Sequence, residues 1–536
     1  MIITDPMNAS EKPPMNVANL RRHQAAVGCL TPIFLVARPT LLQSNDLPPE
    51  FHMNHRRSSQ RVRIKLVLAA LALLSASDRA CADEPQSFPR PVTGFDSLLI
   101  AQQGSRGSLF DDTKKSAPAT EPLGALFADD ASKSSPWRGF VRGELAYTLG
   151  DPEHWSKLMV RSELDAQGSL TPDVRYKLGA RFDYDFVYDA TQFYPSDVQH
   201  DQRTNFMLRE NYLDFGVGDL DVRFGRQHIV WGEMVGLFFA DVVSAKDLRE
   251  FILPDFDILR IPQWAARAEY TKDDFHAETI WVFAPSYDEI GKPGADFFPA
   301  APPPPPGFAT FYDNEQIPKR DLSHTNYGLR LSWLRNGWDL SGFYYNSMDS
   351  SATFYRQIVV EPRPAFVYQA RHDRIGQFGA TLAKDFGQGV FKAEAVYTHG
   401  RRYNVLRLDQ DDGVVRQNTL DLVAGLDFPL PADSRLNLQL FTRAFFNHDP
   451  DIVPKRNEPG FSVLFNRKIT DRLEAEVLWI TSLVRTDWML RPKLAWDFQR
   501  NWRLVLGIDL FEGPTLGFFG QFDNRDRVYT EVRYSF

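Results

Sequence analysis

The feature that most constrains the fold is a strict alternation of apolar and polar side chains in segments of 10 to 13 residues. Residues 174–186, VRYKLGARFDYDF, show it most clearly: Val174, Tyr176 and Leu178 share one face with further apolar residues, and charged residues occupy the other face. Soluble strands average about five or six residues, whereas a tilted membrane-spanning strand needs about 9 to 11. The pattern therefore predicts strands with one face in hydrocarbon and one in water.

About eighteen such segments follow one another after residue 136. They start near residues 137, 156, 174, 206, 220, 263, 275, 327, 338, 374, 390, 419, 435, 460, 472, 489, 502 and 527. Tight turns such as Asn336-Gly337 alternate with long loops such as 229–262 and 285–326, so all tight turns fall on one side. An unpaired backbone group costs several kcal/mol in hydrocarbon, so only an edge-free sheet can span it. We predict an all-β fold, a transmembrane antiparallel β-barrel of about 18 strands (16–18).

The amino-terminal part reads as an export signal and a tail. No run approaches the 18 or so apolar residues of a spanning helix, and the longest, Leu66 to Ala76, follows a basic stretch and precedes Ala80-Cys81-Ala82. We expect residues 1–52 to come from a start site assigned upstream of the true one and to have no structural role. We expect a signal peptide at 53–82, cleaved after Ala82 of the Ala80-Cys81-Ala82 site, a disordered periplasmic tail at 83–136, and the barrel at 137–536. A genuine but disordered leader remains the alternative for 1–52.

Composition excludes several classes of function. Both cysteines lie before Asp83, so the mature chain has neither a disulfide framework nor cysteine chemistry. After Ala82, 51 basic residues stand against 64 acidic ones, a net charge of about −13 that argues against nucleic-acid binding. The histidines form no metal or hydrolase motif, and the acidic stretch 409–413 fits a polar hairpin tip as well as a calcium loop. We expect no enzyme activity, no cofactor and no metal.

Two stretches carry a family resemblance. Residues 224–270 contain Gly-Arg-Gln at a strand end followed by Trp231-Gly232-Glu233, and the chain ends on DNRDRVYTEVRYSF, residues 523–536. Both resemble a family of uncharacterised proteobacterial outer-membrane barrels, and the architecture is more distantly similar to the alginate exporter. The resemblance implies an outer-membrane location in a Gram-negative bacterium and a transport role, with an inner-membrane permease for hydrophobic compounds as a candidate partner. The final strand also resembles a barrel assembly signal, in Val532, Tyr534 and Phe536.

Residues of the distinctive stretch and inward charges are candidates for lining a pore. They are Arg223, Arg226, Gln227, Trp231, Glu233, Phe238, Phe239, Asp241, Arg142, Arg181, Glu210 and Asp214. Ser244 and Asp247 form a capping box that predicts a short helix at 245–251. The apolar residues from Val235 to Val243 would be costly in open water, so we expect the loop to fold into the barrel mouth. There it would narrow a pore or act as a plug without a ligand.

The inward charges of both signs are roughly balanced, which argues against a polyanion channel and favours cross-strand ion pairs. We predict an outer-membrane channel for small solutes, hydrophobic ones among them. The alternatives are a component of an export or lipid-transfer assembly with a periplasmic or inner-membrane partner, and a plugged structural barrel. We expect contacts with outer-membrane lipid, lipopolysaccharide and the barrel assembly machinery.

Overall fold

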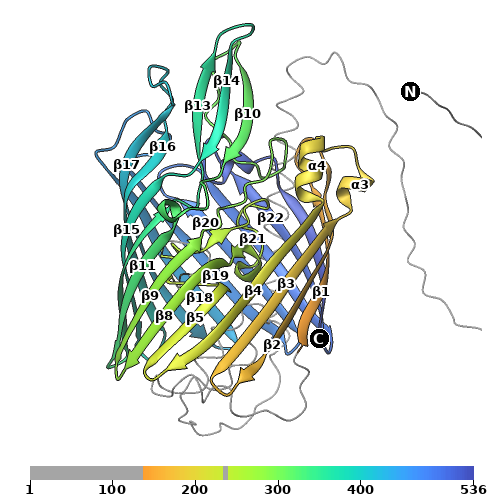
Figure 1. Cartoon of the computed structure of the whole chain (residues 1–536). Helices are drawn as coiled ribbons and strands as arrows, with labels where there is room; N and C mark the ends of the chain where they lie inside the picture. Colours follow the sequence, from red (N-terminus) through yellow and green to blue (C-terminus); the bar gives the residue numbers. More distant parts are fainter. Residues whose placement is uncertain (1–136, 233, 235–239) are drawn as a thin grey trace, which may run out of the picture. The chain divides into compact units, whose positions relative to one another are not determined.

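The computed structural model describes residues 137–232, 234 and 240–536, and within them eighteen antiparallel strands form a closed barrel (Figure 1). The barrel strands are β1 (Trp137–Thr148), β2 (His154–Thr171), β3 (Val174–Asp185), β4 (Thr204–Val217), β5 (Leu220–Gln227), β8 (Gln263–Lys272), β9 (Phe275–Ala284), β11 (Asn326–Arg335), β12 (Trp338–Met348), β15 (Arg374–Asp385), β16 (Val390–Asn404), β17 (Val414–Leu430), β18 (Ser434–Phe446), β19 (Asn457–Thr470), β20 (Leu473–Ser482), β21 (Trp488–Gln499), β22 (Trp502–Glu512) and β23 (Arg527–Ser535). The last strand pairs with the first, from Phe140 opposite Ser535 to Thr148 opposite Arg527, which closes the ring. The predicted fold class is confirmed.

The predicted strand starts and connections agree with the structure. Every predicted start lies within five residues of an observed one, the largest difference being at β17. Asn336 and Gly337 both have positive φ, 53° and 73°, as the two-residue Asn-Gly hairpin turn requires. Short turns lie at one end of the barrel and long loops at the other (Figure 1). Phe536 exchanges two backbone hydrogen bonds of 3.0 Å with Gly139, so the start of the first strand and the end of the last strand both lie at the end with the short turns.

The two faces of each strand follow the alternation in the sequence. On β2, Leu158 and Val160 point outward with 39% and 42% of their surface exposed, whereas Arg161 and Glu163 are buried on the inner side. Trp333 and Trp338 stay about half exposed on either side of the Asn-Gly turn, where an aromatic girdle is expected. The apolar face is therefore the outer surface, and the charged face lines the lumen.

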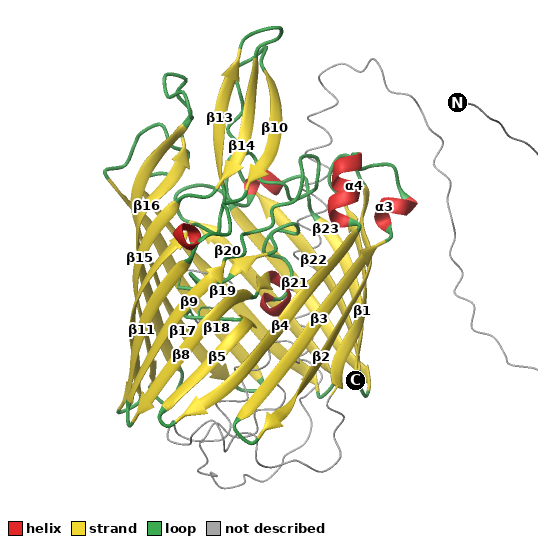
Figure 2. Cartoon of the chain, in the orientation of Figure 1, coloured by secondary structure: helices red, strands yellow, loops and turns green. Residues whose placement is uncertain are grey.

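Long loops carry the remaining elements. They are α3 (Val187–Ala190), α4 (Ser196–Gln202), β6 (Ala245–Lys246), α5 (Phe256–Leu259), β7 (Arg260–Ile261), β10 (Ala309–Gln316), η3 (Leu322–His324), β13 (Thr353–Val359), β14 (Ala365–Arg371) and η4 (Gly520–Phe522). β10, β14 and β13 form a small sheet above the loop end of the barrel (Figure 2). No helix in the described part of the chain has the length and hydrophobicity of a membrane span. The leader, the signal peptide with Ala80 and Ala82, and the tail at 83–136 lie outside the described residues.

Candidate functional site

The loop between β5 and β8, residues 228–262, enters the barrel interior. Near its start, Trp231 packs on β12, with ring centroids 5.1 Å from Phe343 and 5.7 Å from Tyr345. Farther along, Phe251 and its neighbours pack on β20, β21 and β22, against Ile480, Met489 and Phe511. Because β12 and β22 are on opposite sides of the strand order, the loop crosses the lumen. The described part of this loop therefore lies inside the barrel, as predicted, whereas residues 233 and 235–239 lie outside the described residues.

Two glycines explain how the Trp231-Gly232 pair fits. A Cβ atom on Gly328 of β11 would lie 2.7 Å from the Trp231 ring, so the ring lies directly on the backbone of the wall. A Cβ on Gly232 would lie 2.8 Å from the backbone of Ala240 and Asp241, where the loop returns. Real Cβ atoms do not approach other atoms so closely, so both positions require glycine.

A single carboxylate of the wall holds the loop on the side of the lumen where Trp231 packs. Glu394 on β16 accepts hydrogen bonds from the backbone N–H groups of Met234 and Ala240, at 3.2 and 3.1 Å. Glu394 is 5% exposed, so both bonds are made away from bulk water. Hydrogen bonds to a charged acceptor are roughly twice as strong as neutral ones. Glu394 therefore fixes the loop to the wall at two points.

Arginines of the opposite wall hold the loop through its backbone. The Arg181 guanidinium, which is fully buried, donates to the Ile258 carbonyl at 2.9 Å. Arg491 donates to the Leu253 carbonyl at 2.7 Å, and Arg209 donates to the carbonyls of Arg260 and Asp257. Each bond satisfies a buried backbone carbonyl of the loop, so these arginines support the loop's backbone.

The same wall carries a network of ion pairs. Glu144 on β1 pairs with Arg142 at 2.6 Å, with Lys157 at 2.8 Å and with Arg161 at 3.3 Å. Arg161 also pairs with Asp183 on β3 at 2.8 Å. These residues lie on adjacent strands, so the prediction that inward charges form cross-strand pairs is confirmed.

The capping box at Ser244 does not start a helix, and the predicted helix at 245–251 is wrong. The Ser244 hydroxyl donates instead to the Ile229 carbonyl at 3.1 Å, and Ala245–Lys246 form strand β6 with β7. Asp241 pairs with Arg260 at 2.8 Å across this hairpin. Burial by itself would raise the pKa of the Asp241 carboxyl, but Arg260 and Lys246 outweigh it and hold this pKa below its usual value. Contacts with residues distant in sequence therefore outweigh the local preference for a helix.

The other predicted lumen residues differ in their surroundings. Arg223 forms a 2.9 Å ion pair with the buried Asp214, and Glu210 pairs with Lys177 at 2.5 Å in partly exposed positions towards the short turns. Gln227 is fully buried, and its side-chain amide donates to the Ala265 carbonyl at 3.0 Å. Arg226 is half-buried and has no ion pair among the described residues. Glu233, Phe238 and Phe239 lie outside the described residues.

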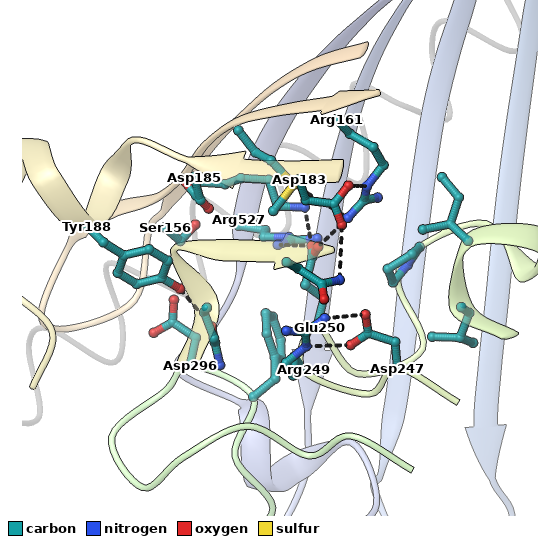
Figure 3. Close-up of a pocket in the computed structure, with 18 of the residues that line it drawn as sticks. Ser156, Arg161, Asp183, Asp185, Tyr188, Asp247, Arg249, Glu250, Asp296 and Arg527 are labelled. Atoms are coloured by element: carbon teal, nitrogen blue, oxygen red, sulfur yellow. Dashed lines mark hydrogen bonds and ion pairs between the residues drawn. The ribbon is translucent and has the colours of Figure 1, made fainter. Parts of the chain in front are cut away.

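A cavity opens between the loop and β2–β3 (Figure 3). The cavity has several charged side chains in its lining, together with the aromatic ring of Phe297; the charged residues include Lys157, Arg161, Arg249, Glu250 and Arg527. It offers about 50 Å³ of space. One water needs roughly 10 to 15 Å³ measured in this way, so the cavity holds a few waters and no organic solute. The loop therefore leaves only a narrow polar space on this side of the lumen.

Sequence reasoning found the wall side of this site better than the loop side. Arg142 and Arg181 were predicted and both lie in the network, and Trp231 and Asp241 lie in the loop as expected. The roles of Glu250, Glu394 and Arg527 were not predicted. Their inward position on strands marks Glu394 and Arg527, but no sequence signal identifies the loop atoms that they contact.

Two further groups of contacts lie at the loop end of the barrel. Asp296 joins loops by contacts with His154 at 3.0 Å, Tyr194 at 2.7 Å and Arg525 at 3.2 Å. The acidic stretch 409–413 surrounds the Arg356 guanidinium, which donates to the Gln410 carbonyl at 2.8 Å. Among the described residues, no group of three or more histidine, cysteine or acidic side chains is arranged to hold a metal ion.

A closed eighteen-stranded barrel with an apolar outer face, and with one loop folded across its lumen, defines an outer-membrane β-barrel of the porin type. The chain belongs to the family described as protein of unknown function DUF1302, whose model matches residues 66–438. The resemblance to an uncharacterised barrel family is thus confirmed. No curated protein matches the chain.

Several solved outer-membrane proteins are similar to this chain. Acinetobacter baumannii OccAB4 is 10% identical with a TM-score of 0.44, and the match covers 75% of this chain and 97% of that one. Pseudomonas aeruginosa OccK8 (OprE) gives the same four values. Salmonella typhi OmpF, solved in complex with daunomycin, is 8% identical with a TM-score of 0.38, and the match covers 75% and 97% of the two chains.

Proposed function

We propose that this barrel is a gated channel of the outer membrane of a Gram-negative bacterium, and that it passes small solutes, hydrophobic ones among them. The observation that carries the proposal is the loop at 228–262, which joins opposite walls of the lumen through named side chains. A pore-narrowing loop must be held against water and solute flow, and these contacts supply that hold. The partly exposed charges on the short-turn side fit a hydrated vestibule below the loop.

The way in which the loop is held favours a gate over a permanent plug. Beside its apolar packing, the loop makes hydrogen bonds and ion pairs to wall residues that keep other partners: Arg491 retains Asp509, and Arg161 retains Glu144 and Asp183. Release of the loop therefore leaves most wall charges paired, which keeps the energetic cost of opening low. A permanent plug never leaves the wall, so it would not need wall charges that keep a second partner.

Planar-bilayer recording of the purified mature protein tests the proposal. Replacing residues 229–262 by a short glycine-serine linker should turn brief openings into a steady current several times larger. Shortening the hairpin tip at 405–413, which lies at the loop end of β16 and β17, is the matched control and should leave the current unchanged. A wild-type barrel that is silent until the loop is replaced would identify a plug. Silence from both forms would refute the channel.

A further inference from the structure

The loop places two consecutive residues of complementary chemistry, Glu250 and Phe251, into two adjoining sites of the barrel. The Glu250 carboxylate contacts Lys157 of β2, lies 3.9 Å from Arg161 and lies 3.6 Å from Arg527 of β23. All three cations come from the wall and converge on one carboxylate of the loop. Figure 3 labels two of them, Arg161 and Arg527, in the pocket that also contains Glu250. The first site is therefore a carboxylate site that the chain itself occupies.

The second site is an aromatic pocket beside the first. The Phe251 ring is 4.8 Å from Phe522, 5.2 Å from Phe518 and 6.0 Å from Phe519, by ring centroids. Phe297 completes the pocket at 5.3 Å from Phe522. The Arg527 guanidinium lies 5.3 Å over the Phe297 ring, so a single side chain belongs to both sites.

Backbone strain indicates that Phe251 is held in place by its pocket. Phe251 has a φ of 55°, in the left-handed region that a bulky residue rarely adopts. Such strain persists only where surrounding contacts compensate for it, and it is released when the segment leaves. Contacts in the pocket therefore hold Phe251 against its backbone strain, so a ligand that makes the same contacts without the strain can displace it.

The charge of the wall indicates which kind of ligand could displace the loop. In the described residues, the wall part of this connected ion-pair network has six cations, Arg142, Lys157, Arg161, Arg181, Arg491 and Arg527, against four carboxylates, Glu144, Asp183, Asp509 and Glu531. The loop supplies further carboxylates, from Asp247, Glu250 and Asp255. When the loop leaves, the wall is short of negative charge.

We propose that the solute of this channel is an amphipathic carboxylate, with one carboxylate joined through a short link to an aromatic or aliphatic group, and that it opens the gate by displacing Glu250 and Phe251. The cavity beside Lys157, Arg249 and Phe297 admits only water while the loop is in place, so the solute enters both sites as Glu250 and Phe251 leave them. The carboxylate takes the place of the Glu250 carboxylate between Lys157 and Arg527, and the apolar group takes the place of the Phe251 ring. This proposal rests on the proposed gated channel.

Binding to the purified full-length mature barrel tests the proposal with three probes. By calorimetry, 3-phenylpropionate should bind, whereas 3-phenylpropionamide, which lacks the charge, and propionate, which lacks the ring, should bind at least tenfold more weakly. The Glu250→Gln/Phe251→Ala variant removes the internal competitor, so it should bind 3-phenylpropionate at least tenfold more tightly than wild type. Glu361→Gln, in the exposed turn between β13 and β14, is the control and should match wild type.

Two further measurements keep this inference separate from the channel itself. Arg527→Gln should lose binding while retaining the heat-dependent gel migration of a folded barrel, and 3-phenylpropionate should raise the wild-type open probability at least threefold. Equal binding of all three probes, or no gain in the double variant, overturns the inference. If the loop-replaced barrel conducts while the probes have no effect, the channel stands and its proposed solute class falls. If the double variant binds but no form conducts, the channel falls and the site stands.

Discussion

The Arg181→Met substitution tests the gate most sharply, because Arg181 joins the wall to the loop at two points. Its guanidinium donates to the Ile258 carbonyl at 2.9 Å and lies 3.4 Å from Asp247 in the loop and 3.2 Å from Asp183 in the wall. Both carboxylates keep another cation, Arg249 for Asp247 and Arg161 for Asp183. The main loss is therefore the carbonyl bond and one of two charges on Asp247.

The expected magnitude follows from these contacts. A hydrogen bond from a charged donor contributes about 1.5 to 3 kcal/mol. Repulsion from the nearby Arg161 and Arg209 guanidiniums offsets part of the stabilisation that Arg181 gives. We take a net loss of about 2 kcal/mol from the closed state, which at 1.4 kcal/mol per factor of ten raises the ratio of open to closed channels about 30-fold.

Single-channel recording in planar bilayers measures this ratio directly. Arg443→Met is the matched control, because Arg443 pairs with Asp421 on the neighbouring strand and has the same charge on an inward face. It should leave the open probability within about threefold of wild type. An unchanged Arg181→Met channel, or equal opening in both variants, would refute the assignment of Arg181 to the gate.

Three further predictions concern the loop and its surroundings. Gly328→Ala places a Cβ 2.7 Å from the Trp231 ring, and overpacking of this kind costs about 1 to 3 kcal/mol. Tryptophan fluorescence and open probability should therefore both change. The control Gly342→Ala, whose Cβ would have its nearest neighbour at 3.9 Å, should change neither. Asp487→Asn removes the charge that accepts hydrogen bonds from the N–H groups of Phe518, Phe519 and Gly520 at 2.8 to 2.9 Å. It should destabilise the loop at 513–526 by about 2 kcal/mol and speed its proteolysis, and protection equal to wild type would contradict this role. The carboxyls of Asp241 and Asp247 lie inside the barrel, where loss of water contact favours a higher pKa, yet Arg260 and Arg249 hold both pKa values below the usual value. Their stabilisation is therefore complete above the usual aspartate pKa of about 4 and is lost only as the pH falls through the lowered values. Open probability should consequently stay constant from pH 7 to about 4 and rise below it, and opening that begins near pH 6 would show that other groups control the gate.

The barrel could be predicted from sequence because each strand is specified by its own alternation. Side chains two positions apart, such as Leu158 and Val160, must share a face whatever the rest of the chain does. The Asn336-Gly337 turn is equally local, since its positive φ values are intrinsic to those residue types. Only β17 began noticeably earlier than expected, because its first residues pair with the extended end of β16 above the barrel.

The loop contacts could not be predicted, because they join residues far apart in sequence. Ser244 has the local signature of a helix cap, but the carbonyl of Ile229 takes its hydroxyl. Glu250 has no distinguishing neighbour, and its three cations come from β2 and β23, at opposite ends of the barrel sequence. The small sheet of β10, β13 and β14 was also missed, because residues such as 353–359, TFYRQIV, show no strict alternation of apolar and polar side chains.

Lipid contact with the outer face is the central claim, and the absence of cysteine after Cys81 makes it directly measurable. Single cysteines at Leu340 and Ser341, adjacent residues of β12 that are 44% and 7% exposed, can each carry a fluorescent label in reconstituted vesicles. Brominated acyl chains should quench the label at position 340 strongly and the label at position 341 hardly at all. Equal quenching at the two positions, or none at either, would contradict the account.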